Sequence, residues 1–230
     1  MKKFTKILSL VVAVATLVGI MSTTALAANN TRFTDVADNA WYADTVKAAA
    51  EAGIIAGNAN GTFDPNGTLT WAQAVTFAVR AHQYSIVYAY ESEGMEAPIH
   101  IYGAADQTGS HWYDVYVNYA LANGMISSVP TNPETPITRA DTAKIFNTFA
   151  IEKATTYNYL PDDYFTDVPE NSNGHDAILR LANIGILTGK TATVNGHATF
   201  DPNGNLLRCE MATIVSRAID LVDRATISAN

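Results

Sequence analysis

The hydrophobic positions of this chain repeat one helical pattern three times. In each stretch apolar residues recur at spacings of three and four, and a glycine closes the run, which predicts an amphipathic helix with a C-terminal glycine cap. The three runs are Val46, Ala49, Ala50, Gly53; Val117, Ala120, Leu121, Gly124; and Ile178, Leu181, Ala182, Gly185. Each repeat leaves an apolar face that only its neighbours can cover, so we expect the repeats to pack together.

A second helix is predicted in each repeat. Thr70 and Thr138 precede this helix in the first two repeats, and Gln73 completes a capping box with Thr70. The inward faces are Ala74, Phe77, Ala78, Ala81; Thr142, Ile145, Phe146, Phe149; and Met211, Ile214, Val215, Ala218. Their small residues let three such helices approach a common axis. The pattern therefore predicts a mainly α protein of three helix-loop-helix repeats.

Turn-forming residues separate the two helices of the first and third repeats. Residues 60–67 and 195–204 each contain an Asn-Gly turn and a phenylalanine, Phe63 or Phe200, which we expect to anchor the loop on the core. The second repeat has three prolines there instead. One aspartate opens each repeat ahead of the first helix, and we predict that it caps this helix as a structural residue. These aspartates are Asp35, Asp106 and Asp167.

The repeats define the predicted domain boundaries of the chain. The first is predicted over residues 31–84, the second over 104–152 and the third over 163–224. Residues 85–103 form an inserted connection that is longer than an ordinary loop. Its tyrosines and isoleucines are compatible with a short hairpin or with continuation of the preceding helix. This insert is the best candidate for contacts with a partner protein.

The N-terminus has the organisation of a secretory signal. Lys2, Lys3 and Lys6 precede an apolar stretch over residues 7–20, and Ala25-Leu26-Ala27 fits a cleavage site. We therefore predict a signal peptide over residues 1–27 and a secreted protein. The apolar stretch is short for a membrane anchor, and no second hydrophobic span follows it, which predicts a mature chain without a membrane span.

Charge excludes several classes of partner. Removal of the three lysines of the signal leaves 11 basic and 22 acidic residues, a net charge of −11. Such a surface argues against nucleic acid and against charge-driven adhesion to anionic lipid. An anionic ligand is expected only where a local arginine outweighs the negative electrostatic potential of the rest of the surface. The single cysteine, Cys209, leaves no internal disulfide and is expected to be a small core residue.

No motif predicts catalysis, a metal ion or a cofactor. The five histidines lack ligand spacing, and the chain has no nucleophile elbow. Residues 64–67 lack the spaced ligands of a calcium loop. We therefore expect a protein that is not an enzyme. A pair of carboxylates that only the fold brings together is the one catalytic arrangement left open, which would make the protein a glycoside hydrolase.

Taken together, these motifs resemble the S-layer homology domain, which occurs as three tandem modules in bacterial surface proteins. The matching pieces are Phe-Thr-Asp-Val at 33–36, Gly-Ile-Ile-Ala-Gly at 53–57, Asn-Gly-Thr-Phe-Asp-Pro at 60–65 and Thr-Arg-Ala-Asp at 138–141. The resemblance implies a pseudo-threefold bundle with grooves between modules. It also implies that the grooves bind a secondary cell-wall polysaccharide, often one that carries a pyruvate ketal.

By the same resemblance, Arg139 and Arg208 are the glycan-binding arginines. A guanidinium at a helix N-terminus suits a ketal carboxylate, because the arginine fork and free N–H groups both attract an anion. An ion pair between repeats is the alternative role for these arginines. Trp71 occupies the arginine position of the first repeat, so at most two anionic grooves are expected.

Three tryptophans are further candidates for contact with the sugar face. They are Trp41, Trp112 and Trp71. Each has packing between or beneath the repeats as its alternative role. The predicted function is non-covalent attachment to the cell wall, with the cell surface or S-layer as the location. A self-assembling structural component of the surface layer is the alternative function.

Overall fold

The computed structural model describes residues 33–151, 159–191 and 193–228. The predicted signal peptide lies outside the described residues. Within the described ranges the chain forms α-helices and one short 3₁₀ turn, with no β-strand. The helices are α2 (Ala43–Glu51), α3 (Trp71–Ser92), α4 (Asp114–Ala122), α5 (Arg139–Ile151), α6 (His175–Asn183) and α7 (Arg208–Ser228), and the 3₁₀ turn η1 spans Ala104–Asp106. The prediction of a mainly α fold is confirmed.

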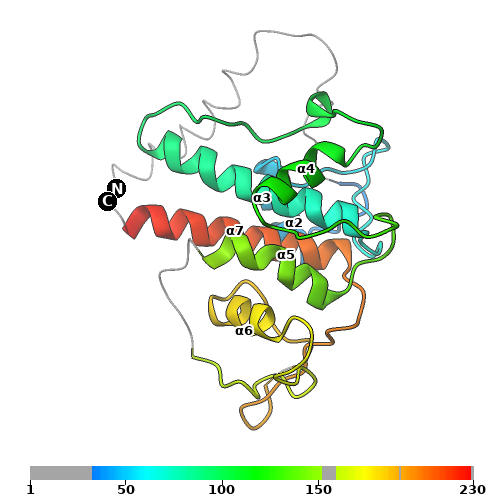
Figure 1. Cartoon of the computed structure of the whole chain (residues 1–230), viewed down its shortest axis with the longest axis vertical. Coiled ribbons are helices and arrows are strands. Elements are labelled where there is room, and N and C mark those ends of the chain that lie inside the picture. The colour runs from blue at the N-terminus through cyan, green and yellow to red at the C-terminus, as the bar shows by residue number, and fades with distance from the viewer. Residues whose placement is uncertain (1–32, 152–158, 192, 229–230) are drawn as a thin grey trace. The chain divides into compact units, whose positions relative to one another are not determined.

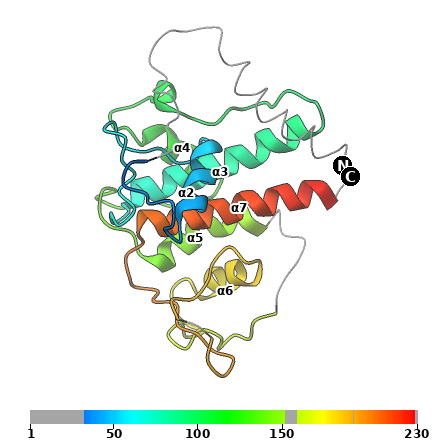
Figure 2. The same ribbon diagram turned by 180° about the vertical axis from the view of Figure 1, so that it is seen from behind.

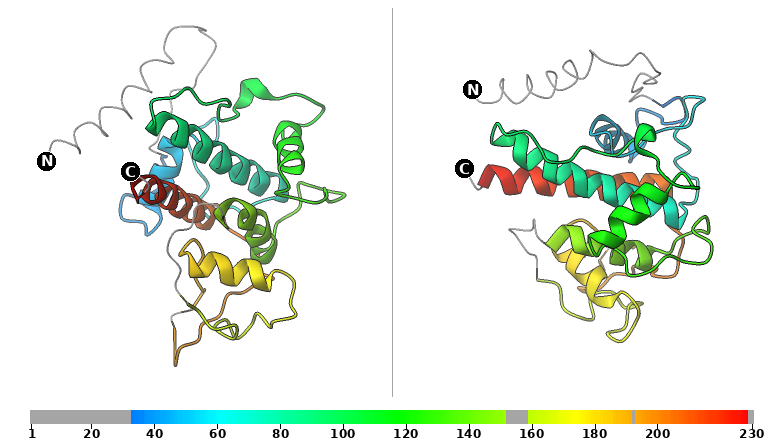
Figure 3. Two further views of the ribbon diagram at one scale, coloured as in Figure 1. Left: turned by 60° about the vertical axis from the view of Figure 1, so that its left-hand side comes forward. Right: turned by 45° about the horizontal axis from the view of Figure 1, so that its top comes forward.

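The helices form three pairs, α2 with α3, α4 with α5 and α6 with α7. The second helices of the pairs, α3, α5 and α7, lie side by side (Figures 1 and 2). Helix α3 packs against both α5 and α7. The shorter first helices cover this set from outside: α2 packs on α7, α4 on α3 and α6 on α5 (Figure 3). Each of these short helices therefore contacts the long helix of another pair.

All three short helices end in the same way. At the end of α2 the N–H of Gly53 donates to the carbonyl of Ala50 at 3.0 Å, and the N–H of Ile54 donates to that of Ala49 at 3.1 Å. This is a Schellman motif, which requires a left-handed residue after the helix, and Gly53 has φ +71°. The same two bonds and a glycine of positive φ follow α4 and α6, as the sequence pattern predicts.

A ring of backbone hydrogen bonds joins the three pairs. Leu69 donates to the carbonyl of Leu206 at 2.9 Å, Leu206 to that of Ile137 at 3.2 Å, and Ile137 to that of Leu69 at 3.0 Å. All three side chains are buried. Because each pair donates to one neighbour and accepts from the other, the contacts close on themselves rather than forming an open row.

The starts of the long helices are attached to the loops of neighbouring repeats. Trp71 and Ala72 of α3 donate to the carbonyls of Thr135 and Pro133. In α5, Arg139 and Ala140 donate to Gly204 and Pro202, and in α7, Arg208 and Cys209 donate to Gly67 and Pro65. These are the first N–H groups of each helix, which lack intrahelical partners. The fold therefore satisfies them within the protein.

The inserted connection continues the helix instead of forming a hairpin. Helix α3 runs on to Ser92, and the chain then returns along it to η1. Tyr102 holds the returning segment. Its N–H donates to Oε1 of Gln83 at 2.9 Å, and its carbonyl accepts from Nε of Arg80 at 3.0 Å.

The core is continuous through all three pairs. It includes the loop residues Phe63 and Phe200, each 1% exposed, which confirms that they anchor their loops. Cys209 is buried and forms no disulfide. Burial raises the pKa of its thiol above the ordinary value. The thiol is therefore a packing residue, as the sequence predicts.

Candidate functional site

Three seams separate the helix pairs, and we name each after the residue that begins its long helix. The Trp71 seam lies where α3 starts against residues 130–136. The Arg139 seam lies where α5 starts against residues 199–204. The Arg208 seam lies where α7 starts against residues 62–67. All three are defined by the backbone bonds between a helix start and a neighbouring loop.

Arg139 is buried in its seam, and all three nitrogens of its guanidinium form hydrogen bonds. Its Nε donates to the carbonyl of Phe200 at 2.8 Å, and the guanidinium lies 4.6 Å from the centre of the Phe200 ring. Nη1 pairs with Oε1 of Glu210 at 3.2 Å, and Nη2 donates to the carbonyl of Thr188. The ion pair between repeats that the sequence left as an alternative is therefore present.

Glu210 connects Arg139 to a second cation. Its Oε1 also accepts from Nζ of Lys190 at 2.7 Å, while Oε2 accepts the N–H of Leu207 at 3.0 Å. Burial lowers the pKa of Arg139, and the nearby carboxylates, Glu210 first among them, act in the opposite direction. Arginine keeps its charge in such a site. The Arg139 seam thus holds a cation that an internal carboxylate already neutralises.

Arg208 takes the equivalent position in its own seam but has a different environment. Its Nε donates to the carbonyl of Phe63 at 2.8 Å, its Nη2 donates to that of Ala56 at 3.2 Å, and the guanidinium lies 4.8 Å from the Phe63 ring centre. The side chain is only half-buried. In the described part of the chain it forms no ion pair.

Two carboxylates lie in the neighbourhood of Arg208 without pairing with it. Burial lowers the pKa of Arg208, while the charges of Asp64 and Asp35 act against that effect. Both oxygens of Asp35 are occupied, because they accept the N–H groups of Phe63 and Asp64 at 2.7 Å. The guanidinium therefore retains donor capacity toward the seam.

Trp71 replaces the arginine in the first long helix, and its seam has no cation in this position. The indole is half-buried and packs against the hydrophobic core. The seam presents a carboxylate instead. Oε1 of Glu134 accepts from Nε1 of Trp112 at 2.7 Å, and Oε2 accepts from the hydroxyl of Thr70 at 3.4 Å. These groups make the Trp71 seam unsuited to an anion.

The other two tryptophans differ in exposure. Trp41 is 68% exposed and Trp112 is 37% exposed. Each stands two residues before a first helix, Trp41 before α2 and Trp112 before α4. Helix α2 packs on α7, and Thr45 in its first turn bonds to Thr213 of that helix. In the third repeat Asn173 takes this place and accepts a bond from Lys144.

The prediction that Asp35 and Asp167 cap the first helices is wrong. Helices α2 and α6 have Tyr42 and Gly174 at their N-caps, with no side-chain bond. The carboxylates instead bind the loop between the two helices. Asp167 accepts the N–H groups of Phe200 and Asp201 at 2.8 and 2.7 Å, as Asp35 does for its own loop. The aspartates are structural, but they fix the loop that forms each arginine seam.

Asp106 has a third role. It does not cap α4, which has Tyr113 at its N-cap. Its Oδ2 accepts the N–H of Gly103 at 2.7 Å, and its Oδ1 lies 2.7 Å from Nε2 of His100. Burial raises the pKa of this carboxyl, but the bonds from Gly103 and His100 outweigh that effect and lower it overall. Asp106 thus closes the η1 turn at the end of the insert.

The prediction that free N–H groups at the N-termini of α5 and α7 bind the anion beside the arginines is also wrong. The structure uses them to bind loop carbonyls of the neighbouring repeat, because those loops form the backbone contacts between pairs. Side chains must therefore supply the donors for any anion in these seams.

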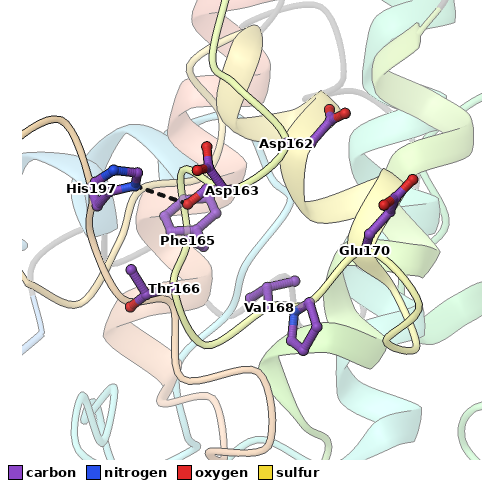
Figure 4. A pocket seen from close by; sticks show the side chains of 8 residues that line it. Asp162, Asp163, Phe165, Thr166, Val168, Glu170 and His197 are labelled. Atoms are coloured by element: carbon purple, nitrogen blue, oxygen red, sulfur yellow. Dashed lines mark hydrogen bonds between the residues drawn. The ribbon is translucent and has the colours of Figure 1, made fainter.

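An open pocket of about 380 Å³ lies on the third repeat, away from both arginines. Figure 4 shows Asp162, Asp163 and Glu170 around it, with His197 bonded to the carbonyl of Asp163 at 3.0 Å. Its carboxylates disfavour an anionic ligand. Among the described residues no group of three or more histidines, cysteines or carboxylates is arranged to hold a metal ion. No helix in the described ranges is long and apolar enough to cross a bilayer.

The repeated seams can be compared with known families. Residues 32–75 and 105–143 match the S-layer homology domain. The matched segments cover the first helix pair as far as the start of α3 and the second pair as far as the start of α5. The segment with α6 and α7 is outside both.

Several relatives align with about half of this chain. A "Surface-layer 125 kDa protein" of Lysinibacillus sphaericus is 34% identical over 127 residues, which are 53% of this chain and 10% of the relative. "Exoglucanase XynX" of Acetivibrio thermocellus is 33% identical, over 51% of this chain and 11% of the relative. A "Cellulosome-anchoring protein" of Acetivibrio thermocellus is 27% identical, over 60% of this chain and 30% of the relative. This chain thus spans less than a third of each relative.

The sequence did not single out Glu210, which pairs with Arg139 across the seam. Gln73, selected in the sequence only for its capping box, is the equivalent third residue of α3. Alignment of the three long helices by their first residues would have placed both at one repeat position. Nothing in the sequence alone shows that this position faces the arginine of another repeat.

Proposed function

We propose that this protein attaches non-covalently to the cell wall by binding an anionic secondary cell-wall polysaccharide in the seams between its repeats. The observation that carries the proposal is the half-buried guanidinium of Arg208, which forms no ion pair among the described residues. The two matches to the S-layer homology domain support it. So do relatives whose names include a surface-layer protein and a cellulosome-anchoring protein.

The proposed mechanism is reversible docking of a carboxylate-bearing sugar. A pyruvate ketal is a suitable group, because its planar carboxylate fits the donor edge of a guanidinium. The Phe63 ring and carbonyl hold Arg208 from behind, so the guanidinium needs little reordering when the anion arrives. Trp41, which is well exposed, is our candidate for an aromatic face that contacts a sugar ring of the polysaccharide.

The helix pair α6 and α7 acts in this proposal as a third module of the same kind. It repeats the Schellman ending, the aspartate bound to a loop and the arginine over a phenylalanine ring. It also supplies Arg208 itself. In this view attachment needs no catalysis, and the protein is a binding module at the cell surface rather than an enzyme.

Co-sedimentation with purified cell walls tests the proposal. We expect the chain without its signal to pellet with intact walls and to remain in solution with walls stripped of their secondary polysaccharide. Equal pelleting with both wall preparations would overturn the proposal.

One observation favours a second function, that of a structural component of the surface layer. The aligned relative from Lysinibacillus sphaericus is a surface-layer protein by name. This function predicts that the purified chain forms regular sheets or higher oligomers without wall material. Analytical ultracentrifugation and electron microscopy would show them, whereas a monomer that binds walls favours attachment.

A further inference from the structure

The two arginine seams differ at one position of the neighbouring long helix, the third residue of that helix. In the Arg139 seam this residue is Glu210, the third residue of α7. Its Oε2 binds the N–H of Leu207, and its Oε1 is left to face the arginine at 3.2 Å. One carboxylate oxygen therefore serves the helix start and the other serves the seam.

The Arg208 seam faces the start of α3, where the third residue is Gln73. Its Oε1 accepts the N–H of Thr70 at 3.1 Å, which is the same bond that Oε2 of Glu210 makes to Leu207. By the equivalence of the two helix starts, we assign the amide Nε2 of Gln73 to the position that Oε1 of Glu210 has in the other seam. An amide nitrogen only donates hydrogen bonds, so it cannot neutralise a guanidinium.

We infer that this third helix residue decides which seam accepts the polysaccharide carboxylate. Gln73 leaves Arg208 open and adds a second donor beside it. Glu210 acts as an internal ligand that occupies Arg139 and keeps its seam closed. The inference rests on the proposed function and names the side chains that regulate the same site.

The chemistry of the two seams agrees with this assignment. A carboxylate that enters the Arg208 seam meets a cation and an amide donor, and a hydrogen bond between charged groups is stronger than one between neutral groups. An anion that enters the Arg139 seam must compete with the carboxylate of Glu210 for the guanidinium, and the like charge of Glu210 repels it. Lys190 does not open that seam, because its ammonium also pairs with Glu210 at 2.7 Å.

Two reciprocal substitutions test the inference. The probe is a methyl glycoside that carries a pyruvate ketal, with its methyl ester as the uncharged control, and binding is measured by isothermal titration calorimetry. We expect wild type to bind the ketal at one site per chain. Gln73→Glu should weaken that binding at least about tenfold, since the new carboxylate reaches Arg208. Glu210→Gln should add a second site of comparable affinity.

Both variants retain the hydrogen bond at the start of their helix, but Glu210→Gln removes the carboxylate partner of buried Arg139 and is expected to be less stable than wild type. Glutamate at position 73 retains the capping box with Thr70 and favours the helix dipole, and glutamine at position 210 retains an acceptor for Leu207. Asp141→Asn is the matched control, because Asp141 is the third residue of α5 and pairs with Lys144 of its own helix, not with an arginine. It should leave ketal binding unchanged.

The outcomes separate the two proposals. Failure of wild type to pellet with intact walls would reject the proposed function itself. Wild type that pellets with walls, together with a Gln73→Glu variant that binds the ketal as well as wild type does, would overturn the inference and leave wall attachment standing. A stoichiometry of one for Glu210→Gln that is folded at the temperature of the titration, as measured by circular dichroism, would also overturn it.

Discussion

Arg139 and Arg208 begin equivalent helices, and each lies over the phenylalanine of a neighbouring loop. They nevertheless have different roles in our interpretation. Arg139 is buried with a carboxylate partner, whereas Arg208 is half-buried without one in the described chain. Burial makes Arg139 a structural group, since removal of one member of a buried pair leaves the other uncompensated. Exposure and spare donors make Arg208 the candidate for ligand binding.

The same substitution at the two sites should therefore separate stability from binding. Arg208→Ala is expected to lower the affinity for purified walls about tenfold or more with little change in thermal stability, because it removes the donor for the anion. Arg139→Ala is expected to lower the free energy of unfolding by about 1–3 kcal/mol while a folded fraction retains wall binding. Co-sedimentation and thermal denaturation of both variants measure the two effects. A larger loss of binding in folded Arg139→Ala would contradict the assignment.

At the scale of elements, each repeat depends on a few backbone positions rather than on side chains alone. The first helices end at glycines of positive φ, and Asp35 and Asp167 each fix a loop through two N–H groups. These loops form the floors of the arginine seams, because the carbonyls of Phe63 and Phe200 accept from Arg208 and Arg139. Local backbone geometry thus positions both guanidinium groups.

Gly53 provides a test of this dependence. A Cβ added at Gly53 meets no atom within 4 Å, so any cost of substitution comes from its φ of +71°. Gly53→Ala should lower the free energy of unfolding by about 1–2 kcal/mol. Gly53→Asn should cost less, because asparagine tolerates the left-handed region better. Chemical denaturation would measure both. Equal stability of wild type and Gly53→Ala would show that the Schellman ending contributes little.

At the scale of the whole described unit, residues 33–228 close through a cycle of three helix pairs. The backbone bonds among Leu69, Ile137 and Leu206 leave no pair at an open end. Helix α2 packs on α7 and α6 packs on α5, so no pair covers its own apolar faces. Stability should consequently belong to the complete set of three pairs, as in other repeat folds whose units cannot fold alone.

Deletion of the third pair should therefore unfold the first two. A chain of residues 28–159 contains both segments that match the S-layer homology domain but lacks α6 and α7. We expect it to lose cooperative thermal unfolding and to be digested by protease at concentrations that leave the full chain intact. Circular dichroism and limited proteolysis measure this. A cooperatively folded fragment would show that two pairs form a sufficient core.

The sequence by itself determined the helices, their glycine endings and the two arginine positions, because all of these depend on local spacing. The period of apolar residues identifies a helical face, and a glycine after it marks the left-handed ending. It also predicted that Phe63 and Phe200 anchor their loops, which the structure confirms. It left the role of residues 85–103 open between a hairpin and a longer helix.

Only the tertiary structure decided which groups of different repeats meet. Asp35 looks like a helix cap in the sequence, but the fold brings the backbone of Phe63 and Asp64 to its carboxylate. The helix starts look like free donors, but carbonyls of another repeat take them. Pairing of Arg139 with Glu210 spans 71 residues, and no local pattern encodes it. Burial and pairing depend on such distant contacts, and they distinguish the two arginines that the sequence presents as alike.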